Sequence, residues 1–590
     1  NFSQADNLRR ASNPESYTKS SSFDESYTLS STLNYSKTFA EKHDLQVLFG
    51  YEVRNTSGSS LSANANSFPV ESAESFALST NANKTASGSL SYGRLLSQFL
   101  RVKYAFDNKY LITANVRRDG SPKFAPSHRW GVFPSVSAGW KITEESFFQN
   151  LELDWISMIK PRFSWGILGN DLALANFAYQ NSYQTLTLHS FDEINSVAGY
   201  NSIKVINEDI KWEEINTINF GLDFAFFEDK LTASAEYYKR NTKDMIYNLP
   251  TPWSSGIGQN NNTTVTTPVN IGSIVNKGWE LTVSYRNKAR NFWYNVSGNL
   301  SSNSNKVIDL GLPTAYIYSG SGSFPFSGTS PFKTVNGLPI GQIYGFKTDG
   351  LIKDQAQIDE LNRVAKEKYT AETGNSASSI YYNKSLTGPG DLLFRDIDGN
   401  GRITDADRTF LGNPWPKFQY GLNLTFGWKE FDFLVGIVGI TGRDVFNSVK
   451  SNQQFIAQDF QSTDEIFNAS YSFGNGLTDQ PSIGRINPAT ENFVKDPNLN
   501  YSSYSDYFVE DGSYMKIKNI SVGYTLPKEL STKMKIENLR IYFTGQNLFT
   551  FTKFTGLDPE FSNDTKNHGL YTFSTYPQTK LYSIGLDLTF

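Results

Sequence analysis

Residues 44–54 read DLQVLFGYEVR. Apolar or aromatic side chains occupy every second position of this segment, namely Leu45, Val47, Phe49, Tyr51 and Val53. Successive side chains of a β-strand point to opposite faces of its sheet, so this spacing predicts a strand with one apolar face. A single strand is not stable by itself, so the number of times the pattern recurs indicates how large a sheet the chain can form.

The same alternation returns along the whole chain. We predict fifteen strands from it, at 27–38, 44–54, 95–106, 110–117, 129–142, 160–168, 215–227, 230–242, 278–286, 291–303, 419–427, 431–441, 514–526, 538–549 and 580–590. Helical spacing of apolar residues is convincing only around 354–368. The sequence therefore predicts an all-β fold.

The links between the predicted strands alternate between short and long. The short links lie at 40–43, 107–109, 228–230 and 429–430, and the long polar links at 55–94, 168–214, 241–277, 304–418 and 441–512. Outer-membrane barrels have short periplasmic turns and long extracellular loops, whereas a soluble sandwich has no reason for this asymmetry. We therefore predict a transmembrane antiparallel β-barrel with large extracellular loops at 304–418 and 441–513.

The composition excludes several classes of protein. Without cysteine there is no disulfide framework and no thiolate metal site. A net charge of −4 does not supply the positive charge with which proteins bind the phosphates of nucleic acids. The longest apolar run, 433–440, is far shorter than the roughly 20 residues of a membrane-spanning helix. A barrel strand crosses with about 9–11 alternating residues, and the many aromatics near strand ends are typical of its interfacial girdles.

Several blocks resemble the SusC-like branch of TonB-dependent outer-membrane transporters. The strongest is RDGSPKF at 118–124 followed by RWGVFPSVSAGW at 129–140. Similar blocks are KPRFSWG at 160–166, NKGWE at 276–280, GLPIGQIYGF at 337–346 and GQNL at 545–548. Their order and spacing cover the chain from about residue 37 to its end.

The resemblance implies a barrel of about 22 strands with an N-terminal plug. If the short links are periplasmic, an even-stranded barrel needs an odd number of strands before residue 1. We therefore expect residues 1–590 to be the C-terminal part of the barrel, with about seven strands, the plug and the TonB box upstream.

The resemblance also implies a location and partners. It predicts a protein of the cell outer membrane, embedded in its lipid, that imports oligosaccharides or oligopeptides under a SusD-like lipoprotein lid. TonB would engage the upstream portion, and the complex could be a dimer of SusC–SusD pairs. The alternatives are a siderophore or cobalamin receptor of the same type, and a soluble β-rich glycan-binding surface protein.

No enzyme motif stands out. A nucleophile elbow, a phosphate-binding loop and a paired-histidine metal signature are all missing from the sequence. The four histidines, His43, His128, His189 and His568, are expected at the surface. The loop aromatics Trp253, Phe324, Phe326 and Tyr381 could stack on substrate or pack the loops together, and the sequence leaves both open.

Residues 396–407 read DIDGNGRITDAD and resemble a calcium-binding loop. An EF-hand supplies oxygens at positions 1, 3, 5, 7 and 12. The corresponding candidates are Asp396, Asp398, Asn400, the carbonyl of Arg402 and Asp407. Asp at the last position reaches less far than the usual Glu. The hypothesis is a structural Ca²⁺ ion, and the alternative is a turn closed by side-chain to backbone hydrogen bonds without any ion.

Overall fold

The computed structural model describes residues 16–66, 76–79, 84–181, 183–190, 196–202, 205–251, 254, 266–312, 316–320, 330–376, 379–454, 480–561, 565–573 and 575–590. They form two compact units. The first lies within Asn1–Trp140, Phe163–Ile218 and Thr242–Ile271, and the second within Lys141–Arg162, Asn219–Asn241 and Gly272–Phe590. Each unit is described by itself.

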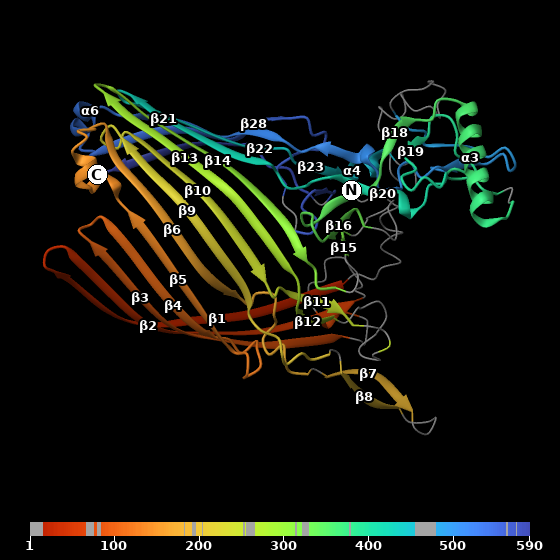
Figure 1. The fold of residues 1–590 in the computed structure, drawn as a ribbon, viewed down its shortest axis with the longest axis horizontal. Helices are drawn as coiled ribbons and strands as arrows, with labels where there is room; N and C mark the ends of the chain where they lie inside the picture. The colour runs from red at the N-terminus through yellow and green to blue at the C-terminus, as the bar shows by residue number, and fades with distance from the viewer. Residues whose placement is uncertain are drawn as a thin grey trace. The chain divides into compact units, whose positions relative to one another are not determined.

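Fifteen strands pair in chain order in one sheet, with β1 and β30 at its two ends. They are β1 (Ser16–Phe39), β2 (His43–Asn66), β3 (Thr85–Phe106), β4 (Tyr110–Gly120), β5 (Trp130–Trp140), β6 (Ile156–Asn170), β9 (Glu213–Phe226), β10 (Leu231–Lys243), β13 (Ser273–Ala289), β14 (Phe292–Asp309), β21 (Phe418–Trp428), β22 (Phe431–Thr441), β27 (Tyr514–Thr525), β28 (Asn538–Thr552) and β30 (Leu581–Thr589) (Figure 1). Each predicted strand range overlaps one of them.

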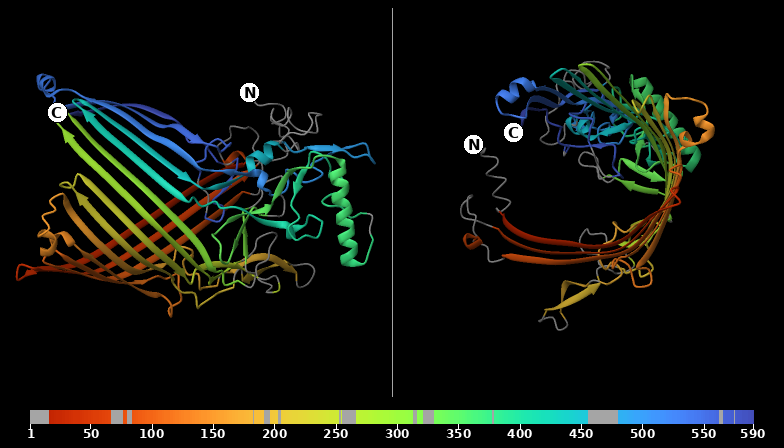
Figure 2. Two further views of the ribbon diagram at one scale, coloured as in Figure 1. Left: turned by 45° about the horizontal axis from the view of Figure 1, so that its top comes forward. Right: turned by 90° about the vertical axis from the view of Figure 1, so that its left-hand side faces the viewer.

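Short links close the pairs at one end of the strands. Asp107, Asn108 and Lys109 join β3 to β4, and the first two have positive φ, which Asp and Asn adopt more readily than most side chains. Lys429 turns the chain between β21 and β22 in the same left-handed region. Within the second unit, both views show α6 (Lys528–Lys533) at the opposite end of the strands from α3 (Gln355–Thr373) (Figures 1 and 2). The predicted asymmetry of the links is therefore present.

In the first unit the register separates apolar and polar side chains onto two faces. One cross-strand row pairs Leu33 with Phe49, Phe49 with Leu100, and Leu100 with Val116. All four are exposed, Leu33 to 72%. We call this apolar side the outer face, and the opposite side the inner face.

The inner face of the same strands is polar and ion-paired. Glu52, Ser97 and Asp119 share one row, and the Arg117 Nε donates to Asp119 at 2.8 Å. A second guanidinium nitrogen of Arg117 donates to the Ser97 hydroxyl at 2.6 Å. The two faces thus have the chemistry of lipid on one side and water on the other.

Beside the short turns, the outer face of the first unit carries a row of aromatic side chains. The register pairs Phe39, His43, Phe106, Tyr110 and Trp140 in that order. Neighbouring ring centroids are 4.9, 6.2 and 6.3 Å apart from His43 to Trp140. Ten residues along β1 separate this row from Leu29. At a rise of about 3.3 Å and a tilt near 40°, they span about 25 Å, which matches the apolar band of a membrane barrel.

The second unit repeats this arrangement. Its outer face carries a row of Phe292, Trp428, Phe431, Tyr524, Ile541 and Leu586. On its inner face Arg540 binds Asp432 through Nη2 at 2.7 Å and Asp587 through Nη1 at 3.2 Å. The same separation of faces therefore holds in both units.

The long links are folded, although the sequence predicts them only as polar loops. The first unit adds β7 (Tyr183–Ser190), β8 (Ser196–Ser202), β11 (Ile246–Pro250) and β12 (Thr266–Asn270). Residues 304–418 add β15 (Tyr316–Ser319), β16 (Phe332–Val335), β17 (Gln342–Phe346), β18 (Thr348–Leu351), α3, β19 (Leu392–Phe394) and β20 (Arg408–Gly412). Residues 441–513 add β23 (Asp444–Asn447), α4 (Ser448–Gln454), β24 (Gly484–Ile486), β25 (Phe493–Lys495) and β26 (Val509–Asp511).

The two large loops share one hydrophobic core. Phe332 and Ile343 of the first loop pack with Phe446, Tyr501 and Phe508 of the second, and all five are fully buried. These residues are far apart in sequence, so no local period reveals them. No helix in the described part of the chain is long and apolar enough to cross a membrane.

The two faces make a testable difference between neighbouring residues. Leu422 lies on the outer face of β21, and Asn423 follows it on the inner face. We predict that Leu422→Arg lowers the free energy of unfolding by about 2–4 kcal/mol, because its cation would lie in hydrocarbon. Asn423→Arg should cost less than about 1 kcal/mol. Guanidinium titrations in detergent micelles measure both, and equal losses would contradict this assignment of the faces.

Candidate functional site

The predicted helix at 354–368 is α3, which extends to Thr373. Asp354 caps it by accepting a hydrogen bond from the Gln357 backbone N–H at 2.8 Å, and Gly374 ends it with φ of 71°. The helix contacts the aspartate-rich loop that follows it in the chain. Lys368 Nζ donates to the Gly399 carbonyl at 2.7 Å, so the helix supports one side of that loop.

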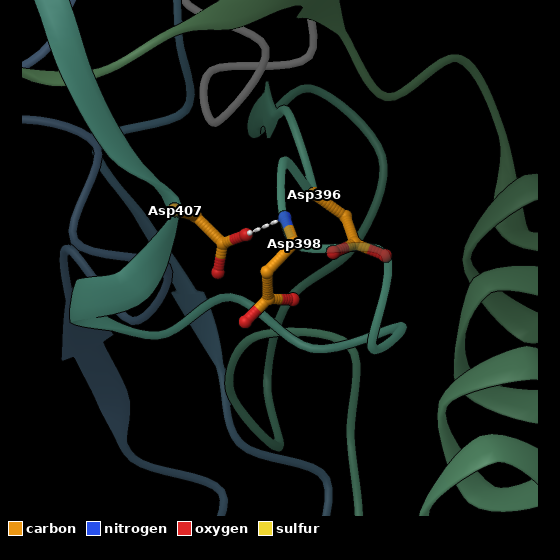
Figure 3. Close-up of side chains that lie close together, drawn as sticks. All are labelled: Asp396, Asp398 and Asp407. Atoms are coloured by element: carbon orange, nitrogen blue, oxygen red, sulfur yellow. Dashed lines mark hydrogen bonds between the residues drawn. The ribbon is translucent and has the colours of Figure 1, made fainter.

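Asp396 organises the first half of the aspartate-rich loop (Figure 3). Its Oδ1 accepts hydrogen bonds from the backbone N–H groups of Gly399 at 2.8 Å and Asn400 at 3.1 Å. Its Oδ2 accepts from Gly401 at 2.7 Å and lies 3.9 Å from Lys368 Nζ. The two glycines have φ near 80°, which a side chain would make strained. The backbone therefore wraps around this carboxylate.

Asp407 closes the loop from its far end. Its Oδ1 accepts from the backbone N–H groups of Ile397 at 2.7 Å and Asp398 at 3.2 Å. Its Oδ2 accepts from the Thr404 N–H at 2.8 Å and the Thr404 hydroxyl at 3.3 Å. Asp407 is fully buried, and these four hydrogen bonds use both of its oxygens. It acts in this geometry as a cap.

Asn400 and Arg402 complete the set of predicted ligands. The Asn400 amide donates to Asp398 Oδ2 at 2.9 Å, and its oxygen accepts from the Arg402 N–H at 2.8 Å. The Arg402 guanidinium turns away from the aspartates, to Glu372 at 3.0 Å and over the Tyr369 ring. Only the backbone of Arg402 is thus available to the loop.

The predicted acidic ligands do converge. Carboxylate oxygens of Asp396, Asp398 and Asp407 lie within 4.8 Å of one another (Figure 3). Asp398 keeps the most accepting capacity, because each of its oxygens receives one hydrogen bond. The set of oxygen donors suits a hard cation, while the hydrogen bonds to Asp407 also account for the turn without one.

A buried polar network lies beside this loop and ties the two large loops together. Asp391, fully buried, accepts from the Arg485 guanidinium at 2.5 Å and from the Asn500 amide at 2.9 Å. Asn498, also fully buried, bonds to Asn500 and to the Leu392 carbonyl. Burial raises the pKa of Asp391, and Arg485 opposes that shift. The sequence carries no signal for this network, because Asp391 lies about a hundred residues from Arg485 and Asn500.

Asp496 is a second buried carboxyl in the same region. It accepts from the Tyr501 and Ser502 backbone N–H groups and from the Ser502 hydroxyl at 2.6 Å. Burial raises its pKa to about 7, although these hydrogen bonds oppose the shift. The loops therefore contain a group that titrates near neutral pH.

The segment that follows β28, residues 553–561, is held by a buried lysine of the sheet. Lys516 of β27 is 1% exposed, and its Nζ lies 2.6 Å from Asp558 Oδ1 and 2.9 Å from Glu560 Oε2. Lys518 adds a contact to Glu560 at 2.7 Å. Removing one partner of such a pair leaves an uncompensated buried charge, so this contact strongly disfavours release of the segment.

Aromatic rings and cations form one surface on the small sheet β15–β16–β17–β20. Tyr316 and Tyr318 are exposed by 42% and 43%, and Lys333 Nζ lies 4.8 and 5.3 Å from their ring centroids. Arg408 stacks at 5.0 Å on Tyr344, whose ring also lies 4.3 Å from Lys333 Nζ. In the described part of the chain no carboxylate pairs with Lys333 or Arg408. We call these five residues the tyrosine–cation surface.

A cavity of about 410 Å³ adjoins this surface. Arg408 lines it, together with Lys384, Phe346, Phe394 and Tyr504. Its other lining residues include Thr404 and Asp405 of the aspartate-rich loop. Aromatic walls with a few charged groups are typical of ligand sites.

The loop aromatics and the histidines that the sequence analysis singled out lie elsewhere in the chain. Trp253, Phe324 and Phe326 lie outside the described residues, and Tyr381 is half-buried. The expectation that His568 is a surface residue holds only in part, because its side chain is half-buried. It stacks on Trp415 at 4.6 Å, and burial lowers its pKa to about 4. His128 is partly exposed, 3.8 Å from Asp209, and His43 is half-buried against Phe106. The side chain of His189 is outside the described set.

Comparison with known proteins identifies relatives. A family model described as TonB dependent receptor-like, beta-barrel, matches residues 1–548. TonB-dependent receptor P3 of Formosa agariphila is 30% identical over 572 residues, which cover 94% of this chain and 51% of that protein. TonB-dependent receptor SusC of Bacteroides thetaiotaomicron is 28% identical over 503 residues, covering 84% and 44%. The chain spans about half the length of the curated relatives it matches.

The fold has a solved counterpart in the RagAB peptide transporter. The TM-score is 0.76 at 22% identity, over 98% of this chain and 56% of that one. The predicted SusC-like resemblance is thus confirmed, and the relatives are receptors and transporters rather than enzymes. With its apolar outer face and polar inner face, the chain belongs to the TonB-dependent receptor-like β-barrel family of the outer membrane.

Proposed function

We propose that the protein containing this chain is a TonB-dependent active importer of oligosaccharides or oligopeptides. The observation that carries the proposal is the separation of an apolar outer face from a polar, ion-paired inner face in both units. A polar inner face offers hydrogen bonds to a hydrated solute, and folded loops on one side can select it. The similarity to SusC and to the RagAB peptide transporter supports this class of substrate.

The rest of the barrel, the plug and the partner proteins are proposed from the family resemblance. The barrel would have about 22 strands and enclose an N-terminal plug. TonB would engage the portion upstream of this chain, and a SusD-like lipoprotein would cover the loops, as one SusC–SusD pair or as a dimer of pairs. A siderophore or cobalamin receptor remains the alternative within transport, and a soluble glycan-binding protein conflicts with membership of an outer-membrane family.

We propose the tyrosine–cation surface as a point of contact with the substrate. Exposed tyrosine rings can stack on sugar rings or on peptide side chains. Lys333 and Arg408, which form no ion pair within the described residues, favour a carboxylate or sulfate. The neighbouring cavity of about 410 Å³ offers room for one or two residues of such a substrate.

The contact can be tested by uptake in cells that depend on the receptor. Tyr318→Ala combined with Lys333→Gln should reduce uptake of an acidic oligosaccharide or peptide at least fivefold. Lys353→Gln, a charge change in the same loop outside the surface, should leave uptake unchanged. Normal uptake by the double variant would refute the contact, and normal growth of a receptor deletion on all such substrates would refute the importer itself.

The lipoprotein partner requires a separate measurement. The affinity-tagged receptor should co-purify from outer membranes with a SusD-like lipoprotein near one-to-one stoichiometry. A siderophore or cobalamin receptor would be isolated without such a partner and would respond to iron or cobalamin limitation instead.

We also propose that the aspartate-rich loop holds one structural Ca²⁺. Asp396, Asp398, Asn400 and the carbonyl of Arg402 would supply oxygens, and Asp407 would hold the loop closed or join the ligands. The ion would offset the repulsion among three carboxylates that meet beside a single lysine, Lys368. The ion would make the loop rigid and would take no part in a reaction.

Metal analysis decides between the ion and the bare turn. The purified receptor should contain close to one equivalent of calcium, and the Asp396→Ala/Asp398→Ala variant should lose it. Chelation should also increase proteolysis near residues 396–407 in the wild type. Asp359→Ala, which removes an exposed carboxylate from α3, should change neither result. A wild-type protein without calcium would leave the loop as a turn.

A further inference from the structure

On the outer face of the first unit, a polar row replaces an apolar one partway along β1, β2 and β3, on the side away from the short turns. An apolar row on this face runs through Leu29, Val53 and Leu96, and exposed apolar side chains return further out at Phe23 and Leu90. The next row on the same face consists of Tyr27, Asn55 and Arg94. Arg94 therefore lies one outer-face row beyond Leu29, which is about 25 Å from the row of aromatic rings, and this distance equals the height of the apolar band of a membrane barrel.

The row of Tyr27, Asn55 and Arg94 is preorganised. Arg94 Nε donates to the Asn55 Oδ1 at 2.7 Å, and the Asn55 amide donates to the Tyr27 hydroxyl. These bonds use one of the Arg94 nitrogens and leave its two terminal nitrogens without a partner in the described part of the chain. Glu25, one row further out, forms no ion pair with Arg94 among those residues. The positive charge of Arg94 is therefore not neutralised within the described residues.

A second arginine lies on the same face of β4, the strand next to β3. Arg118 pairs in register with Gln98 and Val132, which places it on the outer face of β4. Its guanidinium lies 4.3 Å from the Trp130 ring centroid, so it leans toward the strand end. A long cationic side chain that reaches from the apolar band toward the interface is typical of snorkelling.

The surface around Arg94 is concave. A cavity of about 440 Å³ is lined by Tyr27, Asn55, Tyr92, Arg94 and Phe177, all within the first unit. Tyr92 and Tyr27 are exposed by 58% and 56%. The cavity thus combines aromatic walls with hydroxyl, amide and guanidinium donors and has no carboxylate in its lining.

We propose that Arg94 and Arg118 bind the phosphate-bearing headgroup of an outer-leaflet glycolipid. The site directly continues the lipid-facing surface, so a lipid presents its headgroup there without leaving the membrane. Guanidinium groups bind phosphate oxygens through paired hydrogen bonds, and tyrosine and tryptophan rings prefer the interface. The cavity accommodates a sugar ring of the headgroup beside the Tyr27 and Tyr92 rings. This lipid site is separate from the substrate contact proposed on the second unit.

Native mass spectrometry of the full-length receptor in detergent micelles tests the site. The probes are lipid A with its phosphates and the same lipid A after enzymatic dephosphorylation. We expect the wild type to retain phosphorylated lipid A at least fivefold better than the dephosphorylated form. The Arg94→Gln/Arg118→Gln variant should lose that preference. Arg54→Gln is the matched control, because Arg54 precedes Asn55 on the same strand but lies on the inner face.

The outcomes are decisive even if a variant folds poorly. Equal retention of the two lipids by the wild type would overturn the proposal without any mutation. Undiminished preference in the double variant, or an equal loss in Arg54→Gln, would also overturn it. The heat-dependent mobility of each variant in electrophoresis verifies that its barrel is folded before lipid is added.

Discussion

The backbone of a chain in hydrocarbon must satisfy all of its hydrogen bonds within itself, because no water is available there. In this protein, pairing between neighbouring strands of the fifteen-strand sheet satisfies that constraint everywhere except along the outer edges of β1 and β30, and it fixes a register in which each residue faces either outward or inward. A slip of one residue would exchange the faces and bring Arg117 and Asp119 into lipid. The apolar rows, the inner ion pairs and the aromatic rows are all consequences of this single register.

Contacts between side chains on the inner face stabilise this register. The Phe99 ring covers Gly50, and the Trp293 ring covers Gly427, so that an added Cβ at either glycine would collide with the ring. Salt bridges such as Arg540 to Asp432 join strands that are not neighbours in sequence. At the far end of the strands, Asp391 and Lys516 hold loop segments through buried charges whose partners lie on other segments. The loops are therefore folded structures that can present a defined surface.

The sequence predicts the strands where lipid imposes a pattern and misses structure where it does not. The prediction for β1 begins at residue 27, whereas the strand begins at Ser16, because its Ser- and Thr-rich extension has no apolar face to alternate. The folded loops were missed because Phe332, Phe446 and Phe508 meet only in three dimensions. The aspartate-rich loop was found from spacing, but the role of Asp407 as a cap depends on four hydrogen bonds that spacing alone does not reveal. The lipid-facing arginines were also missed, since only the register places Arg94 beside Tyr27 and Asn55.

The absence of cysteine makes the central claim directly measurable. Single cysteines placed at each position of β21, Phe418–Trp428, can carry a nitroxide spin label in the receptor reconstituted into lipid vesicles. Collision with oxygen, which partitions into lipid, should be high at Tyr420, Leu422, Leu424 and Phe426, and collision with a water-soluble nickel complex should be high at the positions between them. Accessibility that changes smoothly along the strand, without a period of two, would contradict the account.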